Sequence, residues 1–485
     1  MSGEEQSRLV LTSHPLQRLG AHALAALAEA KGGPEEVDAA GFQSAMRQVI
    51  QDAERASVRE SKAPDGFWQK ASLSFFPNSP MNHPGRRKGK TADGHAKTDA
   101  DVREAVRSWL TIPDPSRWPA VGCVLCGRDA VGFFGKRDVV LAESESYRNS
   151  TPRGHEGVAL CWPCLCCFYA LPYGCQLTGG SSVALHSWDE GFVRRTVRDQ
   201  VRRNRQLALT GQESDRHAEV REVVALYALK HYSERITDGV ELLVFNNNNR
   251  GQLLESHELQ QPLAEWLRKT TRLSGRMRGF QALVMAHATK QLAGIVVLAR
   301  NAFYTPTRVV TTGVNHLADC LMRRSQDHAG THALADLLKS FVTEVMQMNE
   351  KDLTEIRATA RKLGGLLNSA TGRGPLRELR AHLRNSTQLR SWMTRHAVLW
   401  AGAPHEEFGD EPLMSTRLAV LLFDPSPDNP TWLHRDLLFV GVLEELARLG
   451  WRAKDDDEEK DDEVAVQMHK DDEKFMKEGE EGDLP

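Results

Sequence analysis

Apolar side chains recur at helical spacing along several segments of the chain. The first segment begins after His14-Pro15, ends before Gly32-Gly33-Pro34, and carries these apolar residues on one face: Leu16, Leu19, Ala23, Leu24 and Leu27. The same period predicts helices over 41–58, 189–206 and 216–236. These helices alternate with segments that have a different pattern.

Shorter apolar runs predict strands. Val240 to Phe245 ends in Asn246-Asn247-Asn248-Asn249-Arg250-Gly251, which is typical of a turn. Further strand candidates are Ala293–Ala299, Arg308–Thr312 and Arg417–Phe423. Helices mixed with strands predict an α+β class for roughly the first 325 residues.

Beyond about Asp327 the pattern becomes nearly continuous helix. One apolar stripe consists of Leu334, Leu337, Leu338, Phe341, Val342 and Val345, and a second consists of Leu353, Ile356, Ala360, Leu363 and Leu367. Further helices are expected from about Pro375 and over Trp432 to Leu449. Helices joined by short connections predict a C-terminal bundle.

Charge is divided unevenly along the chain. The 485 residues include 62 Lys+Arg and 65 Asp+Glu, a formal net charge of −3. From Lys454 onward 15 acidic residues stand against five lysines, a net of −10, so the preceding 453 residues carry a net of +7. The low-complexity acidic end predicts a disordered tail, whereas the basic body permits a polyanionic partner. Because there is no signal-peptide pattern and no apolar run near ~18 residues, we expect a cytoplasmic protein with no membrane partner.

Seven of the eight cysteines lie between Cys123 and Cys175. Two Cys-x-x-Cys pairs, Cys123-Val-Leu-Cys126-Gly127-Arg128 and Cys161-Trp-Pro-Cys164, are separated by 34 residues. Two such turns supply the four thiolates of a structural Zn²⁺ site that leaves no open position for a catalytic water. The alternatives are buried free thiols and an iron–sulfur cluster, the latter suggested by the additional Cys166, Cys167 and Cys175.

Three clusters of basic residues lack the interleaved acids of an ordinary solvated helix. The first comprises Arg194, Arg198, Arg202 and Arg205, beside a face of Val193, Val197 and Val201; the second comprises Arg373, Arg377, Arg380 and Arg384; the third comprises Arg268, Lys269, Arg272, Arg276 and Arg278. Such helices can dock by an apolar face and present guanidinium groups to phosphates. The clusters therefore predict contact with a nucleic-acid backbone without sequence preference.

Two loops that contain asparagine are candidates for reading base edges. The segment 75–97, expected at the surface, contains Phe75-Phe76-Pro77-Asn78-Ser79-Pro80, then Asn82, and then the basic residues Arg86, Arg87 and Lys88. The turn at 246–251 offers Asn248 and Arg250. Asparagine in a loop is also an ordinary turn residue, so both interpretations stay open.

The order of these features resembles the zinc-finger branch of the large subunit of type I-B CRISPR interference complexes (Cascade). The similarity covers mainly residues 10–180: an N-terminal helix, the Phe-Phe-Pro-Asn-Ser-Pro segment, Cys-x-x-Cys-Gly-Arg, Cys-x-x-Cys, and then Leu171-Pro172 with Gly174. The resemblance implies a non-enzymatic subunit of RNA-guided antiviral defence. It would bind guide RNA and double- and single-stranded target DNA, recognise the protospacer-adjacent motif, and recruit a helicase-nuclease.

The resemblance also implies further partners and an organisation into regions. The partners are the backbone and handle-binding subunits of Cascade, together with a small subunit that resembles the C-terminal domain and can be translated from an internal start at Met322, Met346 or Met348. The expected regions are an N-terminal α+β region with a basic recognition loop (1–120), a zinc-binding module inserted as a four-cysteine finger (121–180), a mixed nucleic-acid-binding region (181–325), a helical bundle (326–452) and a disordered acidic tail (453–485).

Two features depart from the pattern of the family. Cys166 or Cys167 can replace Cys164 as the fourth ligand, and the role of Cys175 is open. The acidic tail has no counterpart in the family, and we expect it to act as a phosphate mimic over a basic groove of the free protein.

The alternative function is a zinc-containing HNH-like nuclease or another nucleic-acid-processing enzyme. Two Cys-x-x-Cys pairs also frame that class, which further needs an Asp-His step and a His directly after the second pair. Here Leu165, not a histidine, follows Cys164. Asn149 and His155 lie between the two pairs, but no Asp-His step precedes them. The sequence therefore favours the non-enzymatic subunit.

Overall fold

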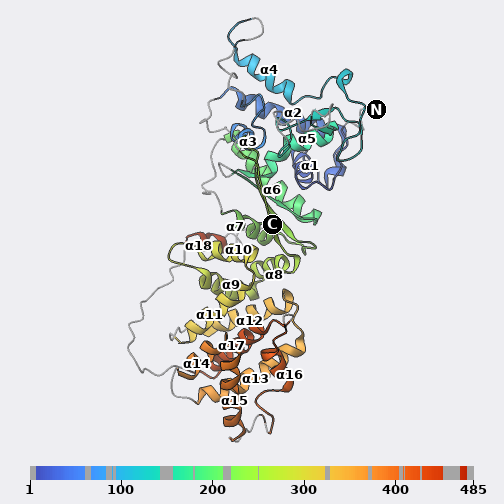
Figure 1. Ribbon diagram of the computed structural model, residues 1–485. Coiled ribbons are helices and arrows are strands. Elements are labelled where there is room, and N and C mark those ends of the chain that lie inside the picture. Colours follow the sequence, from blue (N-terminus) through green and yellow to red (C-terminus); the bar gives the residue numbers. More distant parts are fainter. Residues whose placement is uncertain are drawn as a thin grey trace. The chain divides into compact units, whose positions relative to one another are not determined.

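The computed structural model of the chain divides into two units (Figure 1). Unit 1 comprises Met1–Arg221 and Glu234–Leu259, and unit 2 comprises Glu222–Ser233 and Gln260–Pro485. The structure describes residues 7–59, 67–82, 90, 94–142, 157–177, 181–210, 220–249, 251–322, 328–369, 374–402, 408, 410–426, 429–451 and 470–477.

Unit 1 combines helices with two small antiparallel sheets. Its helices are α1 (Pro15–Leu27), α2 (Ala39–Ser57), α3 (Phe67–Phe75), α4 (Asp99–Trp109), α5 (Trp162–Ala170) and α6 (Glu190–Thr210), with the 3-10 turns η1 (Pro34–Glu36), η2 (Pro115–Arg117) and η4 (Leu171–Gly174). Strand β1 (Gly132–Phe134) pairs with β2 (Val158–Leu160). The second sheet has the order β3 (Gln176–Leu177), β4 (Ser182–His186), β5 (Val240–Asn246) and β6 (Leu253–Leu259). The mixed α+β class is therefore confirmed, with helix predominating.

The predicted first helix is confirmed as α1, which lies at the centre of unit 1. The His14 side chain accepts from the backbone N–H of Gln17 and so caps the first turn, and Pro15 occupies the first helical position, which proline favours. Its apolar face packs on α5 so closely that a Cβ on Gly20 would lie 1.9 Å from the backbone oxygen of Cys167. This crossing fixes the segment that carries the second cysteine pair against the core.

The predicted helix at 189–206 is confirmed as α6, and its valine face docks as expected. Val193, Val197 and Val201 are buried, which places the intervening arginines at the sides of the helix and on its outer face. The strand predicted at Val240–Phe245 is confirmed as β5, the central partner of β4 and β6.

Unit 2 is helical throughout its described part. It contains α7 (Arg221–His231), α8 (Gln261–Arg272), α9 (Ser274–His287), α10 (Gly294–Tyr304), α11 (Thr307–Met322), α12 (His328–Glu344), α13 (Glu350–Asn368), α14 (Gly374–His382), α15 (Ser386–Ala401), α16 (Thr416–Phe423), α17 (Thr431–Arg448) and α18 (Lys470–Lys477). The first residue of α7, Arg221, is assigned to unit 1. The apolar stripe of α13 packs on α17, and the stripe of α12 packs on α9. The predicted C-terminal helices are thus confirmed as a packed assembly.

The three strands predicted at 293–299, 308–312 and 417–423 are wrong, because these residues lie in α10, α11 and α16. Short runs of β-branched residues suggest strands, but the buried positions follow a longer helical period. In α10, Ile295, Val296, Leu298, Ala299 and Ala302 are buried together. In α16, Ser415 caps the helix through a hydrogen bond from the backbone N–H of Leu418, a start signal that the strand prediction overlooks.

Two further expectations need correction. The sequence predicts the segment 75–97 at the surface, but Phe75, Phe76 and Met81 are at most 1% exposed and belong to the core of unit 1. The sequence also predicts disorder throughout the acidic tail, but residues 470–477 form α18, whose Phe475 is 1% exposed. In both segments, aromatic residues within polar surroundings contribute to a core.

Candidate functional site

The first cysteine pair lies on a tight turn that precedes β1. The backbone N–H of Cys123 donates to the carbonyl of Arg128 at 2.6 Å, and the N–H of Gly127 donates to the carbonyl of Cys123 at 2.8 Å. Gly127 has φ of +76°, a left-handed conformation that favours glycine. This turn directs both thiols of the pair to one side.

The second pair lies where β2 meets α5. Cys161 is the N-cap residue of α5, and Cys164 lies in its first turn after Pro163. The N-terminus of a helix carries partial positive charge, which stabilises thiolates. Pairing of β1 with β2, in which Gly132 lies opposite Leu160, brings this helix start beside the first turn.

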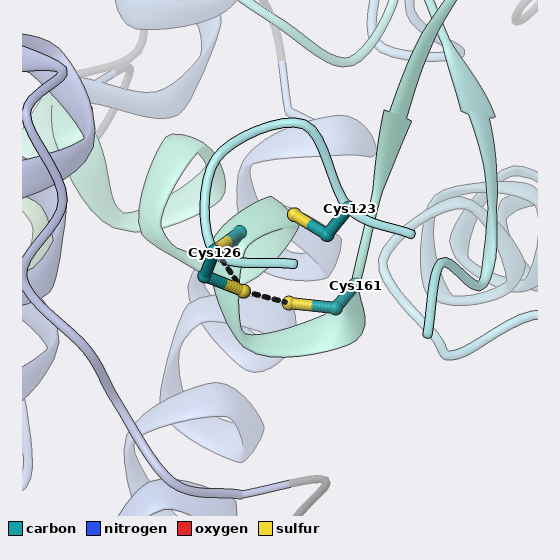
Figure 2. Close-up of side chains that lie close together, drawn as sticks. Cys123, Cys126 and Cys161 are labelled. Carbon is teal, nitrogen blue, oxygen red and sulfur yellow. Dashed lines mark hydrogen bonds between the residues drawn. The ribbon is translucent and has the colours of Figure 1, made fainter. Parts of the chain in front are cut away.

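The four thiols converge on one point. Figure 2 shows Cys123, Cys126 and Cys161 with their sulfur atoms directed toward one another. All four Sγ atoms, including that of Cys164, lie within 4.8 Å of one another, with Cys126 3.4 Å from Cys161 and 3.7 Å from Cys164. Tetrahedral coordination with Zn–S bonds of about 2.3 Å requires sulfur separations of about 3.8 Å. The group is thus positioned to hold a metal ion and is compatible with zinc.

The surroundings favour negative sulfur at Cys126, whereas hydrogen bonds with the neighbouring thiols raise the pKa of Cys161 and Cys164. Hydrogen bonds from the thiols of Cys123, Cys161 and Cys164, together with one from the Arg128 guanidinium, lower the pKa of Cys126. The Nε of Arg128 donates to Cys126 Sγ at 3.3 Å, and its Nη1 donates to the carbonyl of Arg8 at 2.7 Å. Arg128 therefore connects the metal-binding turn to the N-terminal segment.

The additional cysteines lie apart from this group. Cys166, Cys167 and Cys175 are fully buried, and burial raises the pKa of each thiol, to about 12 for Cys167. The Cys167 sulfur accepts a hydrogen bond from Gln17 at 3.4 Å. Among the described residues, the two Cys-x-x-Cys pairs make up the metal-compatible group, with Cys164 as the fourth member.

The first arginine cluster divides between structural and exposed members. Arg198 donates to the carbonyls of Ala30 and Lys31 beyond the end of α1, at 2.7 and 3.2 Å. Arg205 Nε lies 2.8 Å from the side-chain amide of Gln48 in α2 and donates to the amide oxygen when that oxygen is turned toward it. Arg202 is exposed and shares Asp199 with Arg195. Within the described part of the chain, the guanidinium groups of Arg194 and Arg203 are exposed and have no partner.

Six of the nine residues in the second and third clusters have partners within unit 2, and four of these six pair with acids of other helices. Arg380 contacts Asp319 at 2.7 Å, and Arg384 contacts Asp436 at 3.0 Å. Arg377 is exposed on α14, and Arg373 lies outside the described residues. In the third cluster, Arg268 pairs with Glu265, Lys269 and Arg276 pair with Glu344, and Arg272 donates to the carbonyl of Lys230. Most of these cations therefore stabilise unit 2 itself.

The two asparagine loops come together in unit 1. The Nδ2 of Asn249 donates to Asn78 Oδ1 at 2.9 Å, and both side chains are exposed. Asn247 is fully buried and also joins the two loops, because its Nδ2 donates to the carbonyl of Phe75 at 2.7 Å. Asn248 is exposed, and its carbonyl accepts a hydrogen bond from Lys136 at 2.8 Å.

Asn82 has a different position. Its Nδ2 donates to the carbonyl of Phe76 at 3.1 Å, and its Oδ1 accepts from Ser72 at 3.2 Å. The amide is thus used to shape the loop, which leaves Asn78 as the more accessible of the two predicted base-reading residues. The predicted contacts Arg86, Arg87, Lys88 and Arg250 lie outside the described residues.

A pocket beside Asn78 contains two cations that the sequence did not single out. It has a volume of about 240 Å³ and is lined by Asn78, Pro80, Lys97, Asp101, Val102, Ala105 and Arg137. The Asp101 carboxylate already accepts hydrogen bonds from the backbone and hydroxyl of Thr98, both at 2.7 Å. The Nε of Arg137 is buried and has no hydrogen-bond partner among the described residues. Arg137 directly follows Lys136 just after β1, and such a short basic pair gives no pattern signal, so the pocket becomes visible only in the fold.

No helix in the described ranges has both the length and the apolar character needed to cross a membrane. No family, no curated protein and no solved structure matches this chain.

Proposed function

We propose that this chain is a non-catalytic nucleic-acid-binding subunit with a structural zinc site, of the RNA-guided antiviral kind that its N-terminal motifs resemble. The proposal rests on the meeting of Asn78 with the 246–249 turn beside the pocket that contains Lys97 and Arg137. Amide side chains recognise base edges, and cations hold phosphates. An exposed amide next to a cationic pocket suits a duplex held by its backbone while one base edge is contacted.

Zinc is the metal that we propose for the four-thiol group. Four thiolates fill a tetrahedral coordination sphere, so the ion would supply folding energy to the segment around 123–164 and would not activate water. Arg128 would balance part of the negative charge of the thiolates through its bond to Cys126.

The partners follow from the same proposal. The loop around Asn78 would contact the protospacer-adjacent motif, and the exposed arginines of α6, Arg194, Arg202 and Arg203, would contact the backbone of guide RNA or target DNA. Other Cascade subunits and the helicase-nuclease complete the proposed set. Co-purification with the neighbouring gene products tests this directly, since a processed RNA should accompany the complex. A chain that stays alone and free of RNA at low salt contradicts the proposal.

A binding assay tests the pocket itself. Arg137→Gln and Lys97→Gln should each weaken binding of labelled duplex DNA and reduce the slope of log K against log salt by about 1. Arg117→Gln is the matched control, because Arg117 is an exposed cation of the same unit that does not line the pocket. Unchanged affinity in the pocket variants, or an equal loss in the control, would exclude the pocket as the contact.

Sequence discrimination separates the two asparagines. Asn78→Ala should change the ranking of duplexes that differ in the flanking bases. Asn82→Ala removes hydrogen bonds within the loop, so it should weaken binding to all duplexes alike. If Asn78→Ala also weakens all duplexes equally, Asn78 does not read a base edge.

The HNH-like nuclease is the second candidate, and its key His155 lies outside the described residues. Its test is cleavage of DNA that depends on a divalent metal. If the chain cleaves DNA in this way and His155→Ala abolishes the cleavage, the chain is a nuclease and not a non-catalytic subunit.

A further inference from the structure

The helix α18 is seated in unit 2 as a peptide would be seated in a binding site. Figure 1 shows α18 beside α7 and α10, although α18 follows both helices by more than 160 residues in the sequence. The helix has only eight residues, too few to be stable on its own in water. Its contacts with α7, α9 and α10 must therefore hold it.

The first contact is a helix cap supplied from a distance. Helix α10 begins after Ala293, whose side chain cannot cap it, and it has no cap from its own sequence. Asp472 of α18 fills this role, since its carboxylate accepts from the backbone N–H of Ile295 at 2.8 Å and of Gly294 at 3.1 Å. Asp472 is 2% exposed, so this carboxylate is buried against the positive end of α10.

The second contact is an aromatic anchor. The ring of Phe475 is 1% exposed and lies 4.8 Å from the ring of Tyr227 and 5.9 Å from that of Phe280, measured between centroids. Asp472 and Phe475 are three residues apart and therefore lie on one face of α18. This face carries both the charged and the apolar contact.

The third contact fixes the end of the bound helix. Lys230 is buried at 3% exposure, and its ammonium donates to the carbonyl of Phe475 and, at 3.5 Å, to that of Met476. The same ammonium lies 4.6 Å from the centroid of the Phe475 ring. A cation at the last carbonyls of a helix complements the negative end of its dipole.

We propose that α7, α9 and α10 form a docking site for an acidic helical peptide with Asp and Phe three residues apart, that α18 occupies this site as an intramolecular ligand, and that a partner protein bearing the same motif takes its place. The partner's chemistry follows from the site: a carboxylate for the uncapped α10, an aromatic ring for Tyr227 and Phe280, and free carbonyls for Lys230. Eighteen residues separate Trp451 from Lys470, and a tether of this order gives an effective concentration on the order of 1 mM. A partner must therefore compete with α18.

The test uses the full chain and a labelled synthetic peptide with the sequence of residues 468–479. In the variant Asp472→Ala with Phe475→Ala, the tail can no longer fill the site, so the peptide should bind at least 10-fold more tightly than to the wild-type chain. Asp471→Ala is the matched control, since Asp471 is exposed on the same helix and should leave the site filled. Circular dichroism verifies that each variant is folded.

The peptide itself provides the second arm. A peptide with Phe475→Ala, and separately one with Asp472→Asn, should bind the opened chain at least 10-fold more weakly than the original peptide. Peptide binding that is absent from the opened chain, equal in opened and wild-type chains, or insensitive to both peptide changes would overturn the inference. A concentration-dependent wild-type dimer that Phe475→Ala abolishes would assign the site to a second copy's tail, and would overturn the partner-protein inference.

Discussion

Arg128 should tune the metal affinity of the four-thiol group. Its Nε donates to Cys126 Sγ at 3.3 Å, and it is the guanidinium that lowers the pKa of this thiol after the neighbouring cysteines. Loss of a partner that hydrogen bonds to a metal ligand typically lowers metal affinity by about 10- to 100-fold. We therefore expect Arg128→Ala to weaken zinc binding by about 1.4 to 2.7 kcal/mol.

Two further variants separate charge from geometry. Arg128→Lys retains a positive charge, but an ammonium cannot bond Cys126 and the carbonyl of Arg8 in the same fork, so its effect should be intermediate. Arg117→Ala removes an exposed cation a short distance along the chain and should leave the affinity unchanged.

The assay is a competition between the zinc-loaded chain and a chelator of known affinity, with a dye that reports the released metal. The wild-type chain should release one zinc per chain, and cobalt substituted for zinc should show the absorption of a tetrahedral thiolate site. The reasoning is refuted if Arg128→Ala and wild type compete equally with the chelator. If Arg128→Ala lowers the melting temperature of the metal-saturated chain without changing its affinity, the bond to Arg8 is what matters.

Three other perturbations test the packing of the two units. Gly20→Ala should destabilise unit 1 by about 1–3 kcal/mol, because the new Cβ would overlap the backbone of Cys167. Gly365→Ala in α13 is the control: its Cβ meets nothing within 4 Å, so this variant should stabilise the chain by about 0.5–1 kcal/mol. Thermal unfolding compares the two variants, and equal effects on stability would exclude the close crossing of α1 and α5. Burial lowers the pKa of His287 to about 4, so between pH 6.5 and 4 the unfolded chain binds a proton that the folded chain does not. The free energy of unfolding therefore falls as the pH falls, by about 2 kcal/mol at pH 5. Hydrogen exchange of α9 should show this loss of stability, and His287→Gln should remove it. Phe475→Ala should lower the melting temperature of the chain and Asp471→Ala should not, since only Phe475 contributes to a core; equal melting temperatures would place α18 outside the core.

The cysteine group could be predicted from the sequence because its signal is local. Each Cys-x-x-Cys turn fixes two thiols within four residues, and only the meeting of the turns requires the fold. The strands predicted in α10 and α11 are wrong for the opposite reason. A β-branched run of five to seven residues does not distinguish a strand from part of a helix, and the cap of α10 comes from Asp472, far along the chain.

The arginine clusters show a second limit of sequence spacing. A search for acids at neighbouring helical positions finds few, yet Arg380 meets Asp319 and Arg384 meets Asp436 across helices. Likewise, Arg198 meets backbone carbonyls near the end of α1 instead of solvent. Tertiary partners of this kind are invisible to a periodicity argument, because they depend on which helix faces pack together.

The charges left over after this pairing move the expected contact with nucleic acid. Among the described residues, few guanidinium groups of the arginine clusters are exposed and without a partner. The pocket beside Asn78, in contrast, brings Lys97 and the buried Nε of Arg137 next to an exposed amide. Exposed cations on a helix cost little to leave in water, but a buried N–H donor without a partner is costly, so it favours the binding of an acceptor. A phosphate oxygen is such an acceptor, which is why pocket variants should affect DNA binding more than equal numbers of changes on the outer face of α6.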